Sequence, residues 1–274
     1  MKTTIACLAA LMFAGVAAQT APNHHWPLDT NLQDVQGLNN GNAPNPGTHV
    51  PGPVQQGYTH EVWVNPWTTM QGDWAVSMWF NWKRPTTVVG DDWSKLLAAR
   101  DTAGGQGVGV SIVEASLANI VPELAGEVGS LILVIANKQW LVPGGWKIRN
   151  DRWYHLSLSV QGTSFNVRLR DAYGNERAAV LVANALPIPI TSDSKFGFGD
   201  ENGNVLIDDV RAWTTNAKAE ADATYSLAQP RKRLVVEVAG SVTGPWDAAT
   251  TVEIPVFGIS EAEFFRMRFE DVGP

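Results

Sequence analysis

The sequence predicts an all-β protein: a two-sheet antiparallel sandwich with a small β unit at its C-terminal end. Short runs rich in Val, Ile, Thr and Trp recur between turn residues, with 25 Gly and 16 Pro along the chain. Within these runs, inward apolar residues are expected to alternate with outward ones, as they do in strands that cover a core. Helical periodicity is scarce, and the class that follows is all-β.

The first 18 residues are typical of a cleaved secretory signal. They carry a single Lys2, an apolar run over 5–16 and small residues at 16–18. Such a segment is too short and too lightly flanked to span a membrane. We therefore expect residues 1–18 to be a signal peptide, a mature chain that begins near Gln19, and a secreted protein.

Composition limits the classes of function. Cys7 is the only cysteine, so the mature chain would hold no disulfide, and its stability must come from a large core, with or without a bound ion. The formal net charge is −7, or −8 once Lys2 is removed, and the Lys and Arg residues are scattered singly. A nucleic-acid binder needs a basic stripe, so we expect no nucleic-acid partner. No further segment is apolar and long enough to cross a bilayer.

Ten strands and one helical turn are expected along the chain. Residues 19–60 are rich in turn residues and are interpreted as a first strand followed by a long surface loop. A helical turn is expected at 217–225, where Ala, Lys and Glu cluster. The expected strands are 61–65, 74–82, 95–99, 107–113, 130–136, 153–160, 164–170, 177–182, 195–199 and 205–213.

A domain boundary is expected where the charged hinge Gln229 to Arg233 interrupts the turn-rich sequence. The main domain would then span 19–228 and the C-terminal unit 229–274. Three or four strands are too few to be stable alone, so we expect this unit to pack on the main domain. Its expected core residues are Val236, Trp246 and Phe264.

Four segments, taken in chain order, resemble a known family. They are His25 to Asn31, Trp74 to Phe80, Asp151 to Gly162, and Leu206 to Trp213. Together they are similar to the concanavalin A-like, laminin-G-like jelly-roll domains of secreted bacterial proteins, over residues 24–218. The resemblance implies a jelly-roll sandwich and an extracellular or cell-surface location in a bacterium. The C-terminal unit is similar to small β appendages of exported bacterial proteins.

Adjacent acids, Asp208 and Asp209, stand in the last strand of the main domain among apolar neighbours. Buried acids must be paired or bound to a cation. Calcium prefers six to eight oxygen ligands, and the resemblance makes the opening and closing strands neighbours. Asp29 and Asn31 could then join Asp208 or Asp209 around a structural calcium ion. The alternative is that one of these acids bonds Arg211 or backbone amides of the opening loop.

Catalysis is not expected. Sandwich-fold glycosidases use two facing carboxylates, but the alternating acids of such a strand are missing, and Asp208 and Asp209 should face opposite sides. The motifs Gly-x-Ser-x-Gly and His-Glu-x-x-His are also missing. The five histidines lack metal-ligand spacing; His24 and His25 are expected to be solvated, and His155 to be a hydrogen-bonded core residue.

The chain holds 12 Trp residues. Four on strands are expected to be packing residues: Trp74, Trp79, Trp153 and Trp213. Six others border turns or Gly and Pro: Trp63, Trp67, Trp82, Trp93, Trp140 and Trp146. An indole can cover the apolar face of a sugar while polar groups bond its hydroxyls. The ligand-binding candidates are Trp67, Trp82, Trp93, Trp140 and Trp146. That Trp67 and Trp146 only plug the ends of the sandwich stays an open alternative.

These observations favour a secreted, non-catalytic jelly-roll module that binds carbohydrate or another extracellular matrix or cell-surface ligand, with or without a stabilising calcium ion. A rival hypothesis is a structural or adhesive surface protein that self-associates through its sheets or its C-terminal unit. A third is a glycan-cleaving enzyme. Binding to glycans separates the first from the second.

Overall fold

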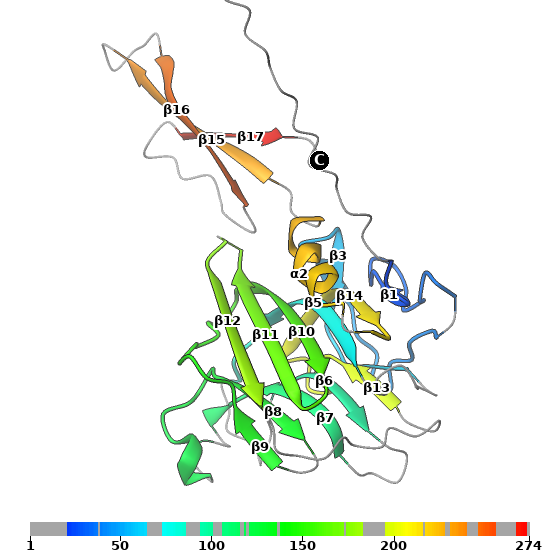
Figure 1. Cartoon of the computed structure of the whole chain (residues 1–274). Coiled ribbons are helices and arrows are strands. Elements are labelled where there is room, and N and C mark those ends of the chain that lie inside the picture. Colours follow the sequence, from blue (N-terminus) through cyan, green and yellow to red (C-terminus); the bar gives the residue numbers. More distant parts are fainter. Residues whose placement is uncertain are drawn as a thin grey trace, which may run out of the picture.

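The computed structural model describes most of the chain beyond the expected signal segment, which lies outside the described residues. The described ranges are 21–37, 39–64, 73–85, 94–100, 106–115, 118, 121–135, 138–172, 174–182, 195–215, 217–227, 231–239, 246–255 and 267–272. Within them, two antiparallel sheets face each other (Figure 1). The predicted fold class is therefore confirmed.

The larger sheet, sheet A, has eight strands, and the smaller one, sheet B, has six. In spatial order sheet A consists of β12 (Glu176–Val182), β11 (Ser164–Asp171), β10 (Trp153–Gln161), β5 (Trp74–Trp82), β14 (Val205–Trp213), β3 (Gln56–Tyr58) and β2 (His49–Pro51), with β1 (His24–Trp26) paired to β14. Sheet B consists of β4 (Val62–Val64), β13 (Lys195–Phe198), β6 (Ser94–Arg100), β7 (Gln106–Ile112), β8 (Leu131–Ile135) and β9 (Lys138–Leu141). A short 3-10 helix, η1 (Pro122–Leu124), precedes β8.

All ten predicted strands are present, with ends that differ by at most two residues. The expected helical turn is α2 (Lys218–Leu227). Three short strands were not expected: β2 and β3, which form a hairpin in the supposed surface loop, and β9. Each has three or four residues, too short to produce an alternating pattern.

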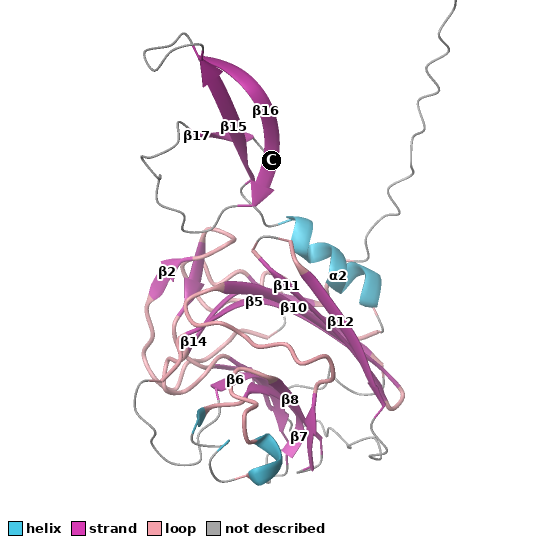
Figure 2. Cartoon of the chain, turned by 90° about the vertical axis from the view of Figure 1, so that its left-hand side faces the viewer, coloured by secondary structure: helices cyan, strands magenta, loops and turns pink. Residues whose placement is uncertain are grey.

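The central strand β5 is buried over all nine residues. Its alternate residues Trp74 and Phe80 belong to the core between the sheets. Its other face lies beneath α2, so the protein has three layers: α2, sheet A and sheet B (Figure 2). Ala221 of α2 and Ala217, which directly precedes the helix, pack on this outer face. A strand buried on both faces loses the alternating pattern and reads as a continuous apolar run.

Trp79 lies on this outer face and is fully buried, stacked on Tyr225 of α2 with ring centroids 5.4 Å apart. It packs between sheet A and the helix, and thus outside the core between the two sheets. Trp74 and Trp213 are also buried. Trp153 was expected to be a packing residue like these, but its side chain is partly exposed at the start of β10.

Strand β14 contains a β-bulge between Asp208 and Arg211, and Asp209 has a φ of 47°. Asp208 lies opposite Trp79, on the sheet face beneath α2. The bulge brings Asp209 to the same side, where its Oδ1 accepts a hydrogen bond from Nε of Arg211 at 3.1 Å. The prediction that the two acids face opposite sides was therefore wrong, because a bulge breaks the two-residue alternation.

The two histidines of β1 are not solvated, contrary to expectation. His24 is 4% exposed, and its Nδ1 lies 2.7 Å from Oδ2 of Asp34. Nε2 of His25 lies 2.6 Å from Oδ1 of Asp209. Burial raises the pKa of Asp34, but hydrogen bonds from the His25 amide and the His24 ring outweigh burial and hold it below its usual value. Both histidines therefore fix β1 to its neighbours.

The C-terminal strands β15 (Arg231–Ala239), β16 (Trp246–Pro255) and β17 (Met267–Val272) form a three-stranded antiparallel sheet, sheet C (Figure 1). The expected boundary at 228/229 and the packing of this unit on the main domain stay predictions. The side chains expected to form its core, Val236, Trp246 and Phe264, lie outside what the structure describes. Within the described part of the chain, no helix has the length and apolar character needed to span a membrane.

Candidate functional site

An open groove of about 580 Å³ lies where the connection between β9 and β10, the start of β10 and the turn between β11 and β12 meet. We call it the Trp146 groove. Its lining combines aromatic and apolar side chains, Trp146, Tyr154 and Leu169, with charged and amide side chains. Its exposed lining is more polar than apolar, whereas most small-molecule sites are mainly apolar with a few placed polar groups.

Trp146 stands at the rim of the groove. Its side chain is partly exposed and packs with its buried part against the core between the sheets. The indole folds back over Gly144, where a Cβ atom would lie 2.7 Å from Nε1 of Trp146. Gly144 also has a φ of +116°, which L residues rarely adopt. The Gly-Gly turn is therefore what allows the ring to lie flat on the backbone.

Tyr154, the second residue of β10, forms part of the groove wall. Its ring stacks on Phe80 of β5 with centroids 5.7 Å apart, and its hydroxyl accepts a hydrogen bond from the amide of Arg149 at 3.0 Å. Burial raises the pKa of Tyr154, so the hydroxyl keeps its proton at neutral pH. It can therefore still donate that proton to a ligand.

The polar lining comes from three separate segments. Arg149 and Arg152 precede β10. Asp171 ends β11 and Asn175 follows it in the turn, and Arg177 lies near the start of β12. Both Asp171 carboxylate oxygens accept hydrogen bonds from Asn175, from its amide nitrogen and its side chain, each at 2.9 Å. This clamp holds the turn in shape.

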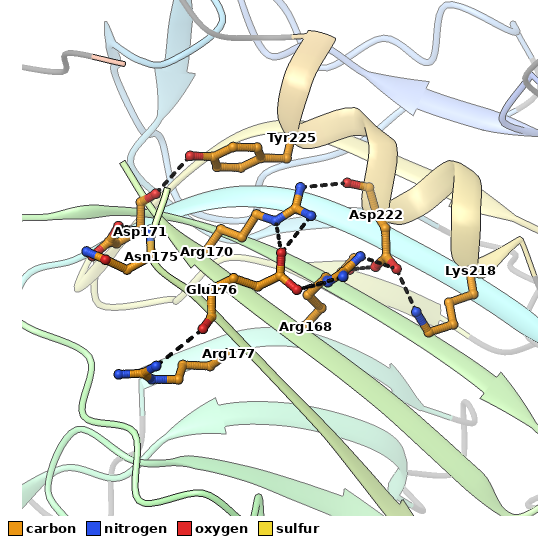
Figure 3. Close-up of polar contacts among 10 residues, drawn as sticks. Arg168, Arg170, Asp171, Asn175, Glu176, Arg177, Lys218, Asp222 and Tyr225 are labelled. Atoms are coloured by element: carbon orange, nitrogen blue, oxygen red, sulfur yellow. Dashed lines mark hydrogen bonds and ion pairs between the residues drawn. The ribbon is translucent and has the colours of Figure 1, made fainter. Parts of the chain in front are cut away.

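Glu176 and Arg177 are consecutive residues of β12, and their side chains lie on opposite faces of sheet A. Glu176 bonds Arg168 and Arg170 on the face that α2 covers. Arg177, the next residue, pairs in register with the inward-facing Leu169 and lines the groove. Figure 3 shows the Glu176 carboxylate directed toward Arg168 and Arg170, and Arg177 directed away from them.

The charges beneath α2 form a separate, mutually satisfied cluster. Asp222 of α2 accepts hydrogen bonds from Arg168 at 2.8 Å, from Lys218 at 2.7 Å and from the Ser157 hydroxyl (Figure 3). Arg170 stacks over the Tyr225 ring at 4.7 Å. The nearby His155, whose Nε2 lies 2.8 Å from the Thr224 hydroxyl, is a hydrogen-bonded buried residue as expected. These contacts fix α2 to sheet A.

Three of the five candidate Trp residues are described by the structure, and of these Trp146 lines the groove. Trp82 is 2% exposed and donates from Nε1 to Ser94 Oγ at 2.8 Å, so it is a core residue and not a rim residue. Trp140 lies on the edge strand β9, partly buried against the core, with its Nε1 atom buried. Trp67 and Trp93 lie outside the described residues.

Trp63 offers a second partly exposed indole, on the outer face of sheet B. Its ring lies against Gly197 of β13, where a Cβ atom would come within 2.8 Å of the ring. Nζ of Lys95 is 5.7 Å from the ring centroid and 2.5 Å from the Glu61 carboxylate. The cation beside this indole is therefore already paired.

The four residues expected to bind calcium do not converge as a set. Asp209 is bonded to His25 and Arg211, as in the alternative weighed from the sequence. Asn31 is exposed, and its Oδ1 accepts from the Gln33 amide at 2.9 Å. Among the described residues, no group of three or more His, Cys, Asp or Glu is arranged to hold a metal ion.

Asp208 and Asp29 remain as a pair near the β2–β3 hairpin. Asp208 is fully buried; its Oδ2 accepts from the Val54 amide at 2.8 Å, while its Oδ1 has no hydrogen-bond partner in the described part of the chain. Burial raises the pKa of Asp208 to about 8, and the carboxylates of Asp209 and Asp29 act in the same direction. A buried acid with a free oxygen beside a second carboxylate fits a cation.

The groove residues other than Trp146 were not identified from the sequence. Arg149 and Arg152 follow Trp146 within six positions, and their closeness to a Gly-Gly-Trp turn was a usable signal. Asp171, Asn175 and Arg177 reach the groove only because β11 and β12 pair beside β10. No local pattern marks such residues.

No protein-family model and no curated protein matches the chain. Solved structures do. The chain is similar to the binding domain of botulinum neurotoxin DC in complex with SialylT, at a TM-score of 0.50 and 12% identity, over 79% of this chain and 56% of that one. It thus spans little more than half of that neighbour's length. At this identity the likeness concerns the fold alone.

Two further similar structures have lower TM-scores. One is domain 4 of AbnA, a GH43 extracellular arabinanase from Geobacillus stearothermophilus, in complex with arabinotriose, at a TM-score of 0.47 and 16% identity, over 73% of this chain and 98% of that one. The other is peanut lectin with a 9mer peptide, at a TM-score of 0.37 and 14% identity, over 70% of this chain and 88% of that one.

Proposed function

We propose that this protein is an exported, non-catalytic carbohydrate-binding module whose ligand lies in the Trp146 groove. The observation that carries the proposal is the groove itself: a partly exposed indole with tyrosine, arginine, aspartate and asparagine side chains around it. The indole supplies an apolar platform for a sugar ring, and the polar groups bond its hydroxyls. The signal peptide expected at residues 1–18 and the jelly-roll resemblance of the sequence support a location outside the cell.

The composition of the groove supports binding over glycan cleavage. Glycosidases of the common type place two carboxylates across the scissile bond. Among the described residues that line the groove, Asp171 is the one carboxylate, and both of its oxygens are engaged by Asn175. A turn-fixing acid of this kind is not positioned to act as general acid or nucleophile.

A structural calcium ion is part of the proposal, with fewer protein ligands than the sequence suggested. Asp29 and Asp208 would supply two carboxylates, and carbonyl groups of the β2–β3 hairpin and waters the remaining oxygens. Support comes from the buried Asp208 Oδ1, which lacks a hydrogen-bond partner among the described residues. The backbone at Gly52 lies close against the Asp208 carboxylate, since a Cβ atom on Gly52 would lie 2.5 Å from Asp208 Oδ2. The ion would stabilise the hairpin and take no part in binding sugar.

Polysaccharide pull-down with the mature protein, followed by titration calorimetry, tests the binding function. We expect Trp146→Ala to weaken binding at least tenfold, about 1.4 kcal/mol or more, while the melting temperature changes little. Trp79→Ala should do the opposite, losing roughly 3 to 5 kcal/mol of stability through the cavity under α2.

Trp63→Ala is the matched control, because Trp63 is a partly exposed indole on the opposite sheet. Its removal should leave binding intact. Loss of binding in Trp63→Ala and not in Trp146→Ala would move the site to sheet B. Absence of binding to every glycan of a broad array would overturn the carbohydrate function.

A second candidate function, self-assembly at a surface, is favoured by the edge of sheet A. Strand β12 ends the sheet, and its Val180 and Val182 are 58% and 57% exposed. An exposed apolar edge strand can pair with a strand of another copy. Size-exclusion chromatography that shows ordered oligomers, dispersed by Val180→Lys, would support this function; a concentration-independent monomer would oppose it.

A further inference from the structure

The charge of the Trp146 groove is opposite to that of the chain. The whole sequence carries a formal net charge of −7. Among the charged residues that line the groove, Lys147, Arg149, Arg152 and Arg177 are basic, and Asp171 is acidic. A basic concavity on an acidic protein attracts anions to one place, since the remaining surface repels them.

Two of these cations have no carboxylate partner among the described residues. The Arg177 guanidinium makes one long hydrogen bond, from Nη1 to the Glu176 carbonyl at 3.4 Å, and the Arg149 guanidinium makes no hydrogen bond or ion pair. Both side chains are exposed at the groove. By contrast, Arg168 and Arg170, on the opposite face of sheet A, are each joined to Glu176.

Two further charges of the groove, Lys147 and Asp171, are already engaged. The Lys147 ammonium is turned toward the loop before β8, where it pairs with Glu127 and bonds Ser130 Oγ at 2.7 Å. The Asp171 carboxylate is held by Asn175. The charge that remains available to a ligand therefore comes chiefly from arginine, whose planar fork matches the two oxygens of a carboxylate or the oxygens of a sulfate.

We infer that the ligand of the Trp146 groove is an acidic glycan, with a sugar ring on the indole of Trp146 and its carboxylate or sulfate group on Arg149 and Arg177. This inference rests on the proposed carbohydrate function and names its ligand class. The indole and the guanidinium groups line one continuous groove. Tyr154 and Asn175 supply the uncharged hydrogen-bonding groups that sugar hydroxyls need.

Polygalacturonate and its fully methyl-esterified form provide the direct test, because they have the same sugar chain and differ in charge. Calorimetric titration of the mature protein should show at least tenfold tighter binding of the charged polymer at low salt, and a smaller difference at high salt. Dextran sulfate against dextran repeats the comparison with a sulfate group. Tight binding of either charged polymer, with its neutral partner weak, supports the inference and identifies the anionic group.

The variants Arg149→Gln and Arg177→Gln should each weaken binding of the charged polymer by about tenfold and leave the neutral polymer unaffected. Arg84→Gln is the matched control, an exposed arginine that is not part of the groove lining, and should bind as the unmodified protein does. Trp146→Ala should weaken both polymers. Circular dichroism checks that each variant is folded.

Three results would overturn the inference. Equal, Trp146-dependent binding of the charged and esterified polymers would leave the carbohydrate function standing and remove the acidic specificity. Charge-dependent binding that survives Trp146→Ala would indicate ion exchange at the surface. Equally tight binding of a single-stranded oligonucleotide would show that the groove recognises anions in general and no sugar.

Discussion

Nε2 of His25 lies 2.6 Å from Oδ1 of Asp209, across 184 positions of sequence. This contact joins the short strand β1 to the bulge of β14. Arg211 binds the same Oδ1 atom, so a histidine and an arginine together satisfy a carboxylate that is 2% exposed. Burial raises the pKa of Asp209, but these partners outweigh burial and keep it below its usual value. The bulge and the anchoring of β1 therefore depend on each other.

A double-mutant cycle measures this dependence. Asp209→Asn is the suitable partner variant, because Asn tolerates the left-handed backbone conformation at this position. We expect His25→Ala to lower the free energy of unfolding by about 1 to 2 kcal/mol, with a coupling to Asp209→Asn of about 1 kcal/mol. Urea unfolding at pH 7 provides the values. Additive effects of the two substitutions would show that the contact contributes nothing.

His155 should make the protein sensitive to acid. Burial lowers the pKa of His155 to about 3; Asp209 and Asp222 oppose this effect and Arg170 supports it. Between pH 6.5 and 3 the unfolded chain binds a proton that the folded chain does not, so stability falls as the pH falls through this window. From pH 7.5 to 5 the loss attributable to His155 should be about 2 kcal/mol.

Urea unfolding of His155→Gln at both pH values checks this expectation. The variant should be less stable at pH 7.5, because it loses contacts with Trp79 and Tyr225, yet lose about 2 kcal/mol less than the unmodified protein on acidification. Trp79→Phe is the control: it alters the same packing without a titrating group and should lower stability equally at both pH values. An unchanged slope in His155→Gln would contradict the assignment.

The strands could be predicted from the sequence, but most residues of the candidate site could not. Runs such as β5 and β10 are long and apolar, so the core they build can be predicted from local pattern. The bulge at Asp209 depends on the pairing of β14 with β5 and β1 and leaves no local signature. His24 and His25 looked solvated beside the expected cleavage point, but their partners Asp34 and Asp209 become neighbours only through folding.

The groove illustrates the same limit. Trp146 could be proposed because a Gly-Gly turn with an adjacent indole is visible in the sequence. Trp82 was equally plausible beside its turn, but the pairing of Trp82 with Val205 and its bond to Ser94 place it in the core. Arg177 could not be identified from the sequence. Consecutive residues of a strand point to opposite faces, so a shift of one residue would place Arg177 on the face beneath α2 and not in the groove.

Removal of the C-terminal unit should leave the main domain folded. Helix α2 ends at Leu227, so a chain of residues 19–229 keeps every described contact of α2 with sheet A. We expect cooperative unfolding with a melting temperature within about 4 °C of the full mature chain. A chain that ends at Ala223 is the matched control and should be much less stable, because it lacks Thr224 and Tyr225. Aggregation of 19–229 would show that sheet C completes the core.

Calcium should stabilise the mature protein through Asp29 and Asp208. An ion that binds only the folded state adds about 2.7 kcal/mol when its concentration is about 100 times the Kd. Replacement of the buried carboxylate in Asp208→Asn should abolish this gain. In chelated protein the same variant should differ little in stability from the unmodified chain, because burial raises the pKa of Asp208 to about 8 and the acid is already mostly neutral at pH 7.

The comparison is made by differential scanning calorimetry of protein first shown to be metal-free, with and without added calcium. Asp29→Asn should also reduce the calcium response. Asp209→Asn is the control, since Asp209 is engaged by His25 and Arg211: it should lower stability but keep the full calcium-induced shift. If the unmodified protein melts at one temperature in both conditions, or if Asp208→Asn responds as strongly as the unmodified chain, these carboxylates hold no ion. The raised pKa of Asp208 would then mean that it is simply protonated at neutral pH.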